Sequence, residues 1–456
     1  MKVLLLNPPG RRRYVRDYYC SKVAKANYSY SPVDLLLLSG RFENVALLDS
    51  IQKRLPPQTC LDRILTERPA AIISLVGAVS WTEDRAFLSS VKNALPRTKI
   101  LISGDAALEI NAEAMARETW LDGVIGDFTN ADVQRFLAGR TEAVERMIFR
   151  DESGRIIESF KPRPVGIIED LPLPRHDLFL GQGYAYPFVR GAAFATVQTD
   201  YGCPFPCRFC IMSQLGYKVR PVRDVLTELT QLKSSGINEI YFNDQTFGCV
   251  PARLEELCQG LIEQDYRLSW CCWSRVDTAY RHLELLKRAG CHTIMFGVES
   301  AADETLDVFR KGFTLDQVKR TFGRCRELGL RTVATYIIGL PDEDRLQIER
   351  TINLALELDS DFASFNVYVP RPGTETRRHL MEQGVISDDE TPLDQTGHFV
   401  SVTAGLLSPK EIKAMRDAAL RRYYLRPAYL FHRLRGVKST YDLQVLIRTA
   451  LTMVWS

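Results

Sequence analysis

Three cysteines stand close together near the middle of the chain, as Cys203, Cys207 and Cys210. They follow an apolar run at residues 193–199 that is typical of a β-strand, so the three thiols share one loop at the carboxyl end of that strand. Parallel barrels keep their active sites at this end of their strands. Three thiolates can hold three corners of a four-iron cluster and leave one iron for a non-protein ligand. The spacing therefore indicates an iron-sulfur site with one open coordination position.

Zinc, or burial without any metal, are the alternatives for the same thiols. A structural zinc ion normally needs a fourth Cys or His close by. The histidine nearest in the sequence, His176, stands in a proline-rich stretch and is a poor candidate. The chain has eleven cysteines, an odd number, and those outside this motif are scattered. This usage is typical of a reducing compartment and one metal site.

The motif resembles that of the radical S-adenosylmethionine (SAM) superfamily, whose C-x3-C-x2-C loop carries an aromatic residue before its last cysteine. Cys203, Cys207, Phe209 and Cys210 match this pattern. The resemblance implies a 4Fe-4S cluster on the three cysteines, with Phe209 beside the cofactor and SAM chelating the open iron. It also implies that one electron from the reduced cluster cleaves SAM to methionine and a 5'-deoxyadenosyl radical, which abstracts a hydrogen atom from the substrate.

Further matches to this family lie at the ends of later apolar runs. Asn243 and Asp244 stand where the family contacts the SAM amino group, and both side chains can accept a hydrogen bond from an ammonium. Arg275 and Glu299 stand where the family places polar side chains against the SAM ribose and carboxylate. Taken singly, each of these residues could equally be a helix cap or part of a barrel salt bridge.

A series of parallel strands is needed to bring these positions together. Six apolar runs alternate with helical patterns, at residues 193–199, 239–242, 268–274, 293–298, 331–338 and 362–369. The fifth run ends on Ile338 and Gly339, which resemble the family's adenine-backing segment, where glycine allows close approach of the backbone. The pattern predicts an α/β fold with a partial (β/α)6 radical SAM barrel over residues 191–390.

A similar alternation occupies the first 145 residues. Its five apolar runs lie at residues 3–6, 45–48, 71–76, 99–102 and 123–125. They predict a doubly wound, flavodoxin-like (Rossmann) parallel sheet over residues 1–145, and open sheets of this class bind ligands at the carboxyl ends of their strands. Residues 146–190 carry a hairpin turn followed by several prolines and are interpreted as a connector.

The N-terminal sheet, connector and cluster barrel together resemble the radical SAM subgroup with a cobalamin (B12)-binding domain. This subgroup includes radical methyltransferases acting on lipids and the anaerobic Mg-protoporphyrin ester cyclase. The cobalamin contacts that the resemblance implies are Asn7, Pro8, Ser74, Leu75 and Gly104.

Two departures from the subgroup bear on cobalamin. The D-x-H-x-x-G signature that supplies a lower axial histidine is missing, because Ile51 stands where the histidine would be. The glycine pair expected after the fourth strand is Gly104-Asp105, whose carboxylate could crowd the corrin. A flavodoxin-like scaffold or dimer surface is the alternative interpretation of this domain.

The C-terminal region, residues 391–456, is predicted to be a helical appendage that contains a capping box at Ser408 and Glu411. Between Arg421 and Lys438 there are six Lys or Arg and no acidic residue, interleaved with aromatic and leucine side chains. This combination predicts peripheral contact with an anionic membrane. A helical lid packed on the barrel is the alternative. Nucleic acid would also suit the charge, but the sequence contains no recognisable RNA module.

Composition excludes several classes of protein. The chain of 456 residues is 45% hydrophobic and 25% charged, and 59 basic against 56 acidic residues leave a net charge of +3. Global disorder and a polyanion-coating protein are both excluded by these values. The N-terminal apolar run is too short for a secretory signal, and no run reaches the roughly 18 residues of a membrane span. We therefore expect a cytoplasmic protein.

The sequence thus predicts a cobalamin-dependent radical SAM enzyme that methylates an unactivated carbon of a hydrophobic metabolite, lipid-like or tetrapyrrole-like. A reductant such as flavodoxin or ferredoxin would supply the electron, and nucleic acid is not expected as a partner. One alternative is radical cyclisation, carbon-carbon coupling or oxidation without methyl transfer. Another is a non-catalytic iron-sulfur or zinc module. The residues that act on the substrate are not identifiable from the sequence.

Overall fold

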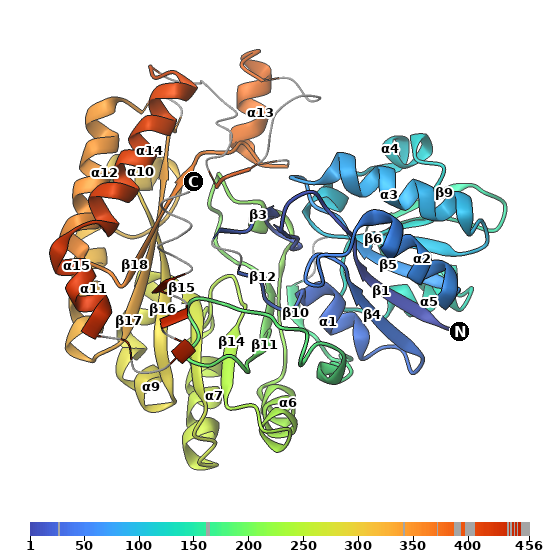
Figure 1. Cartoon of the computed structure of the whole chain (residues 1–456), viewed down its shortest axis with the longest axis horizontal. Coiled ribbons are helices and arrows are strands. Elements are labelled where there is room, and N and C mark those ends of the chain that lie inside the picture. The colour runs from blue at the N-terminus through green and yellow to red at the C-terminus, as the bar shows by residue number, and fades with distance from the viewer. Residues whose placement is uncertain are drawn as a thin grey trace. The chain divides into compact units, whose positions relative to one another are not determined.

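The computed structural model describes residues 1–25, 28–160, 165–340, 343–371, 373–386, 394–396 and 406–435, with a few positions between 437 and 447. The chain forms two compact units. The first comprises Met1–Ala24, Ser29–Ala185 and Lys218–Asp224, and the second comprises Lys25–Tyr28, Tyr186–Tyr217 and Val225–Ser456. Each unit has a sheet of its own, mainly parallel in the first unit and wholly parallel in the second (Figure 1).

The first unit is built on a seven-stranded sheet in the order β4-β1-β5-β6-β7-β8-β9. Its strands are β1 Val3–Asn7, β4 Val45–Asp49, β5 Ala71–Leu75, β6 Lys99–Ser103, β7 Gly123–Ile125, β8 Arg146–Arg150 and β9 Ile156–Phe160. Its helices are α1 Val33–Ser39, α2 Pro57–Glu67, α3 Trp81–Ala94, α4 Ala112–Arg117 and α5 Asp132–Leu137. The five strands from β4 to β7 run parallel, as predicted.

Both faces of this sheet are covered. Leu4 and Leu6 of β1 lie in one core with Ile64 of α2 and Leu88 of α3. Leu5 is fully buried on the opposite side of the same strand, as the alternation of side chains along a strand requires. A strand buried on both faces is apolar at every position, which is why the run at residues 3–6 is continuous. The doubly wound sheet is confirmed.

The hairpin after residue 145 extends this sheet. β8 pairs antiparallel with β7, and β9 pairs antiparallel with β8. Met147, Ile148 and Phe149 are buried, so β8 contributes to the core. The connector predicted to begin at residue 146 therefore begins after Phe160, because two antiparallel strands precede it.

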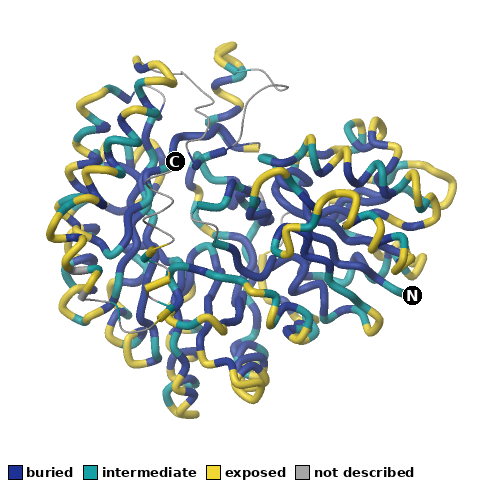
Figure 2. The backbone as a smooth tube through the Cα atoms, in the orientation of Figure 1, coloured by how far each residue is buried: buried dark blue, intermediate teal, exposed yellow. Residues whose placement is uncertain are grey.

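The second unit holds a six-stranded, wholly parallel sheet in the order β11-β14-β15-β16-β17-β18. Its strands are β11 Ala195–Val197, β14 Glu239–Phe242, β15 Ser269–Ser274, β16 Cys291–Glu299, β17 Arg331–Ile338 and β18 Phe362–Val367. The helices that alternate with them are α6 Val222–Ser234, α7 Pro251–Glu263, α8 Val276–Ala279, α9 Leu283–Arg288, α10 Asp303–Val308, α11 Leu315–Glu327 and α12 Arg345–Leu358. The strands are buried and the helices expose their outer sides (Figure 2). The partial (β/α)6 barrel is confirmed.

Two helices of the C-terminal region pack on the last strand of the barrel. α14 Pro409–Tyr424 begins at the predicted capping box, in which Ser408 and Glu411 bond each other reciprocally. The Tyr424 hydroxyl donates to the Ala363 carbonyl at 2.7 Å. The second of the two helices is α15 Pro427–Arg435, and a further helix, α13 Glu375–Glu382, precedes α14 in the chain. Lys438 and most of the region after it lie outside the described residues.

Within the part of the chain that the structure describes, no helix combines the length and the apolar character that crossing a bilayer requires.

Candidate active site

The three thiols of the motif lie on one loop of the second unit, directly after β12 (Asp200–Gly202). The Cys203 amide donates to the Gly216 carbonyl at 3.2 Å, and the Cys210 amide donates to the Cys207 carbonyl at 3.1 Å. Gly202 has φ +81°, and a Cβ there would stand 2.0 Å from the Gly216 carbonyl oxygen. Glycine is therefore required where the chain enters the loop.

The thiols are close enough to influence one another. Burial raises the pKa of Cys210, and the neighbouring Cys203 and Cys207 raise it further. Within the described ranges, no three Cys, His, Asp or Glu side chains converge on a position for a single metal ion. Zinc requires such convergence, whereas a four-iron cluster binds each thiolate at a different iron. The loop therefore supplies three thiols for a cluster held at three corners.

Two cationic side chains lie beside the cysteine loop. Arg275, at the end of β15, directs Nη1 toward Cys207 Sγ at 3.9 Å and lies 3.8 Å from the ring centre of Phe205. Lys311 lies 5.7 Å from the ring centre of Phe209, and its charge opposes the rise in the pKa of Cys210. Positive neighbours favour thiolates over thiols. The electrostatic surroundings thus suit a negatively charged cluster.

Arg275 and Glu299 are both fixed beside this loop by other side chains. Asp277 accepts from Arg275 Nε at 3.0 Å and from its Nη2 at 2.8 Å. Glu299 accepts from Lys311 Nζ at 3.0 Å. The structure therefore brings both predicted residues to the cysteine loop, each within an ion pair.

Asn243 offers an unused donor inside the barrel. Its side chain is fully buried, and Oδ1 accepts from the Tyr241 hydroxyl at 2.6 Å. Nδ2 has no hydrogen-bond partner among the described residues. A buried amide nitrogen without a partner is destabilising, so this atom fits an oxygen of a bound ligand such as SAM.

Asp244 is already satisfied within the protein. Its carboxylate accepts from the Thr199 amide at 2.6 Å, from Thr199 Oγ1 at 2.7 Å and from the Asp200 amide at 3.1 Å. Burial raises the pKa of Asp244. These bonds connect the segment before the cysteine loop to the end of β14. Asp244 therefore has a structural role in the barrel, which is the alternative to a SAM contact for this residue.

The apolar residue exposed at the end of β17 is Ile337 and not Ile338. Ile338 is fully buried, whereas Ile337 is half-buried and packs, as Phe209 does, against the buried cluster that contains Phe309. The one-residue difference arises because successive side chains of a strand point to opposite faces. Gly339 has φ +76° and donates its amide to Glu343 Oε2 at 2.7 Å, so it forms the turn after the strand.

Several side chains on the strands of the barrel are only half-buried. Helices cover the outside of the strands, so a half-exposed side chain on a central strand faces the interior. The half-exposed positions toward the strand ends are Trp273, Gly297, Thr335, Ile337, Ser364 and Asn366. Lys25 donates from Nζ to Ser364 Oγ and Asn366 Oδ1, both at 2.9 Å. Neither Lys25 nor Lys311 belongs to a recognisable motif, so sequence reasoning missed both.

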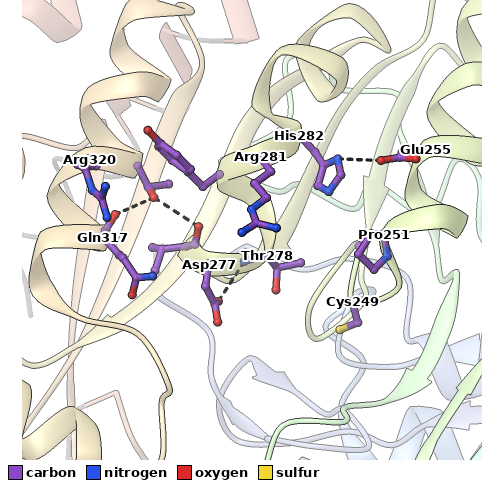
Figure 3. A pocket seen from close by; sticks show the side chains of 13 residues that line it. Cys249, Pro251, Glu255, Asp277, Thr278, Arg281, His282, Gln317 and Arg320 are labelled. Atoms are coloured by element: carbon purple, nitrogen blue, oxygen red, sulfur yellow. Dashed lines mark hydrogen bonds and ion pairs between the residues drawn. The ribbon is translucent and has the colours of Figure 1, made fainter.

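A separate cavity of about 810 Å³ lies among the helices of the barrel (Figure 3). Its walls come from the loop before α7, from α7, α8 and α11, and from the turn at Tyr280–His282. Charges of both signs line it, and His282 Nδ1 lies 3.7 Å from Glu255 Oε1. Asp277 lines the same cavity and pairs with Arg275, which links the cavity wall to the cysteine loop.

In the first unit, a short hairpin covers the carboxyl ends of the strands. We call residues 14–23 the edge hairpin; it contains β2 Tyr14–Val15 and β3 Lys22–Val23, which pair antiparallel. Arg16 donates to Asn7 Oδ1 and to the Pro8 carbonyl, both at 2.9 Å. Arg16 also forms a fully buried ion pair with Asp84 at 2.5 Å.

The residue after Gly104 contributes to the same closure. Asp105 accepts from the Ser21 amide at 2.6 Å and from the Ala78 amide at 2.9 Å. Ile51, which replaces the axial histidine, packs against Tyr14 and Val23 of the edge hairpin. These contacts fix the hairpin to the ends of several strands.

The five predicted cobalamin contacts lie in the interior of the first unit. Asn7 is 5% exposed, Ser74 and Leu75 are 0% exposed, and Pro8 and Gly104 are buried. A Cβ on Gly104 would stand 2.1 Å from the Val76 carbonyl oxygen, so this glycine is required by the close approach of two chain segments. With the edge hairpin in this position, the five residues are too deeply buried to contact a corrin.

Comparison with known proteins supports the barrel and its motif. Residues 197–355 match the model of the Radical SAM superfamily. The uncharacterized methyltransferase PH0819 of Pyrococcus horikoshii is 27% identical, covering 94% of this chain and 94% of its own. The anaerobic magnesium-protoporphyrin IX monomethyl ester cyclase of Rubrivivax gelatinosus is 24% identical, covering 78% of this chain and 66% of its own.

A solved structure shares the fold across both units. The radical SAM methyltransferase TsrM of Kitasatospora setae, with cobalamin and a [4Fe-4S] cluster bound, has a TM-score of 0.67 and 18% sequence identity. The alignment covers 91% of this chain and 85% of TsrM. With the cysteine loop, the parallel barrel and the family match in agreement, this chain carries a radical SAM domain at residues 197–355.

Proposed function

We propose that this protein cleaves SAM reductively and transfers a methyl group to a carbon atom of its substrate. The observation that carries the proposal is the loop with Cys203, Cys207 and Cys210, beside which Arg275 and Lys311 lie. When bound, a 4Fe-4S cluster and SAM supply one-electron cleavage and a carbon-centred radical that abstracts hydrogen.

The chain's own residues have distinct roles in this proposal. The three cysteines hold the cluster, and Arg275 places a positive charge 3.9 Å from one of their sulfurs. Asn243 presents Nδ2 to an oxygen of SAM, because that nitrogen has no partner among the described residues. Ile337 and Phe209 supply an apolar wall beside the loop.

Methyl transfer is supported by the uncharacterized methyltransferase PH0819 of Pyrococcus horikoshii, which matches 94% of this chain. Cobalamin is supported by the likeness of fold to TsrM, whose structure contains it. The five predicted contacts do not fit a corrin beneath the edge hairpin, so we derive no step through cobalamin. We propose only that the first unit is where it binds.

We further propose a hydrophobic substrate, lipid-like or tetrapyrrole-like. Trp273 and Ile337 give the barrel interior an apolar side, and Lys25 adds one cationic group near Ser364 and Asn366. Radical cyclisation or oxidation without methyl transfer is the second candidate, because the cyclase relative matches 78% of this chain. A reductant such as flavodoxin or ferredoxin remains a prediction.

The test uses the anaerobically purified full chain, reconstituted with iron and sulfide and reduced with dithionite. Incubation with SAM carrying a trideuterated methyl group should yield 5'-deoxyadenosine. With a cell lipid extract and added cobalamin, it should also yield a product that has gained the labelled methyl group. A product altered without added label would favour the cyclase alternative. Absence of 5'-deoxyadenosine with a fully loaded cluster would refute both.

A further inference from the structure

Helix α15 turns its polar side to the barrel. Tyr429 is buried and donates from its hydroxyl to the Asp361 carbonyl at 3.0 Å. The Arg433 guanidinium lies 4.3 Å from the ring centre of Phe362, the first residue of β18. These contacts fix the rotation of α15 about its own axis, and they determine which side chains point outward.

The described side chains on the outward side of α15 are apolar. Among the side chains of α15 that the structure describes, those exposed to solvent are Pro427, Ala428, Leu430, Phe431 and Leu434. We call these five residues the α15 apolar face. Leu430, Phe431 and Leu434 are 44%, 62% and 63% exposed. Single exposed leucines are common on proteins, but a contiguous apolar face marks an interaction surface.

The surroundings of this face are basic. Residues 418–441 contain six Lys or Arg and no acidic residue. Arg422 and Arg426 form ion pairs with acidic side chains of α12 and of the turn after it. Arg421 is exposed, and no ion pair involves it among the described residues. Part of the positive charge is therefore used within the protein, and Arg421 leaves one positive charge exposed among the described side chains.

We propose that the α15 apolar face docks on a bilayer containing anionic lipid, with α15 lying in the plane of the interface. Its aliphatic and aromatic side chains would enter the boundary between headgroups and acyl chains, and Arg421 would lie near the lipid phosphates. The sequence beyond α15 has the same character: Leu443 and Ile447 are 44% and 49% exposed. This inference does not rest on the proposed function.

A second copy of the chain is the other occupant considered for this face. A two-fold contact presents the same patch from both molecules, so it would bring the basic surroundings of α15 against themselves. Like charges placed opposite each other disfavour association. Anionic lipid complements that charge, so the charge around α15 favours a membrane over a second copy of the chain.

The test is sedimentation of the full-length protein with vesicles of phosphatidylcholine alone or with added phosphatidylglycerol. Vesicles with phosphatidylglycerol should bind the protein more tightly, and rising salt should weaken this binding.

The triple variant Leu430→Ser, Phe431→Ser, Leu434→Ser should bind at least about tenfold more weakly, because its apolar burial is lost. Arg421→Gln should bind about fivefold more weakly. The control Val165→Ser, Ile167→Ser removes side chains that are 82% and 61% exposed in the first unit, and it should bind like the wild type.

Each opposite result overturns the proposal. Equal binding of the wild type and the triple variant would show that α15 is not the contact. Equal binding to both kinds of vesicle would remove the role of anionic lipid. A wild type that self-associates without vesicles, and loses this association in the triple variant, would assign the face to a second copy. Circular dichroism of each variant separates loss of binding from loss of folding.

Discussion

The two parallel sheets of this protein treat the carboxyl ends of their strands in opposite ways. At the barrel, the cysteine loop, Arg275 and the Glu299–Lys311 pair stand at strand ends, and half-exposed side chains line an interior. At the N-terminal sheet, the edge hairpin covers the same position, and the predicted contacts beneath it are buried. The general rule places a ligand at both edges. The difference teaches that topology fixes where a site can lie, while the loops decide whether it is accessible.

The two edges also differ in how they use charge. Arg275 and Lys311 place positive charge near the three thiols. These thiols would become negatively charged thiolates on binding a metal cluster. Arg16 instead meets the Asp84 carboxylate in an ion pair that is 0% exposed on both sides. A buried charge must be paired or it destabilises the fold, and both edges meet this rule, because Arg275 and Lys311 pair with Asp277 and Glu299. At the barrel, which we call the open edge, these cations also lie beside the thiols. At the N-terminal sheet, which we call the closed edge, Arg16 bonds to Asn7, Pro8 and Asp84 of the same unit.

The largest expected effect comes from removing a thiol at the open edge. Cys207→Ala should abolish reductive cleavage of SAM, because a cluster held by two thiolates lacks its defined open corner. Cys258→Ala is the matched control, since Cys258 is buried in α7 away from the motif and its loss should leave cleavage nearly unchanged. The measurement is 5'-deoxyadenosine formed per reconstituted cluster. Normal formation by the Cys207 variant would refute the open edge as the site of chemistry.

The closed edge should respond to loss of its buried ion pair. Arg16→Ala leaves Asp84 buried without its partner, so we expect the free energy of unfolding of the first unit to fall by about 3–5 kcal/mol. Arg117→Ala breaks an exposed pair with Glu113 and should change it by less than about 0.5 kcal/mol. Urea denaturation with hydrogen exchange measures both variants. Equal, small effects would mean that the edge hairpin is only loosely attached.

A buried carboxyl beneath the closed edge predicts a pH dependence. Burial raises the pKa of Asp34 from 3.8 to about 7, although Ser103 donates to Asp34 Oδ2 at 2.5 Å. The folded protein therefore keeps a proton that the unfolded chain releases. Stability from this group is complete below about pH 4 and is lost as the pH rises through about 7.

The variant Asp34→Asn tests this dependence. Between about pH 5 and pH 8 the wild type should lose roughly 2–3 kcal/mol of unfolding free energy that the variant keeps. The carboxyl groups of Asp105 and Asp17 are neighbours of Asp34, so Asp105→Asn serves as a second comparison. A difference between wild type and Asp34→Asn that does not change with pH would contradict the assignment.

Sequence patterns predicted the strands of both sheets because parallel strands buried on two faces are continuously apolar. The same continuity hides which face each residue occupies, and this is why the sequence pointed to Ile338 where the structure exposes Ile337. The edge hairpin escaped prediction because Arg16 is polar and reads as a surface residue. Its burial depends on Asp84, 68 positions away. Lys311 was missed for a similar reason, since its partner Glu299 lies across a helix.

The C-terminal region was predicted in part. The capping box at Ser408 has a fixed local spacing and could be read directly. The basic and aromatic stretch from Arg421 to Lys438 was consistent with either a membrane-binding surface or a lid on the barrel. In the structure, its described residues fall into two groups. Tyr423, Tyr424 and Tyr429 pack on the barrel, while the α15 apolar face points outward. No local pattern separates these two groups, because both are aromatic or aliphatic and only the docking of α15 distinguishes them.

The smallest expected effect tests the charge at the open edge. Arg275 stands 3.9 Å from Cys207 Sγ, and reduction of a cluster on that loop adds negative charge which the guanidinium stabilises. Arg275→Gln should therefore make the midpoint potential of the reconstituted protein more negative by about 60 mV, the equivalent of a tenfold change for one electron. Arg281→Gln is the control, because Arg281 lines the cavity among the helices and is exposed. Redox titration followed by electron paramagnetic resonance measures both potentials. If the two variants shift equally, the effect is one of net charge, and the position of Arg275 beside the cysteine loop has no special part in it.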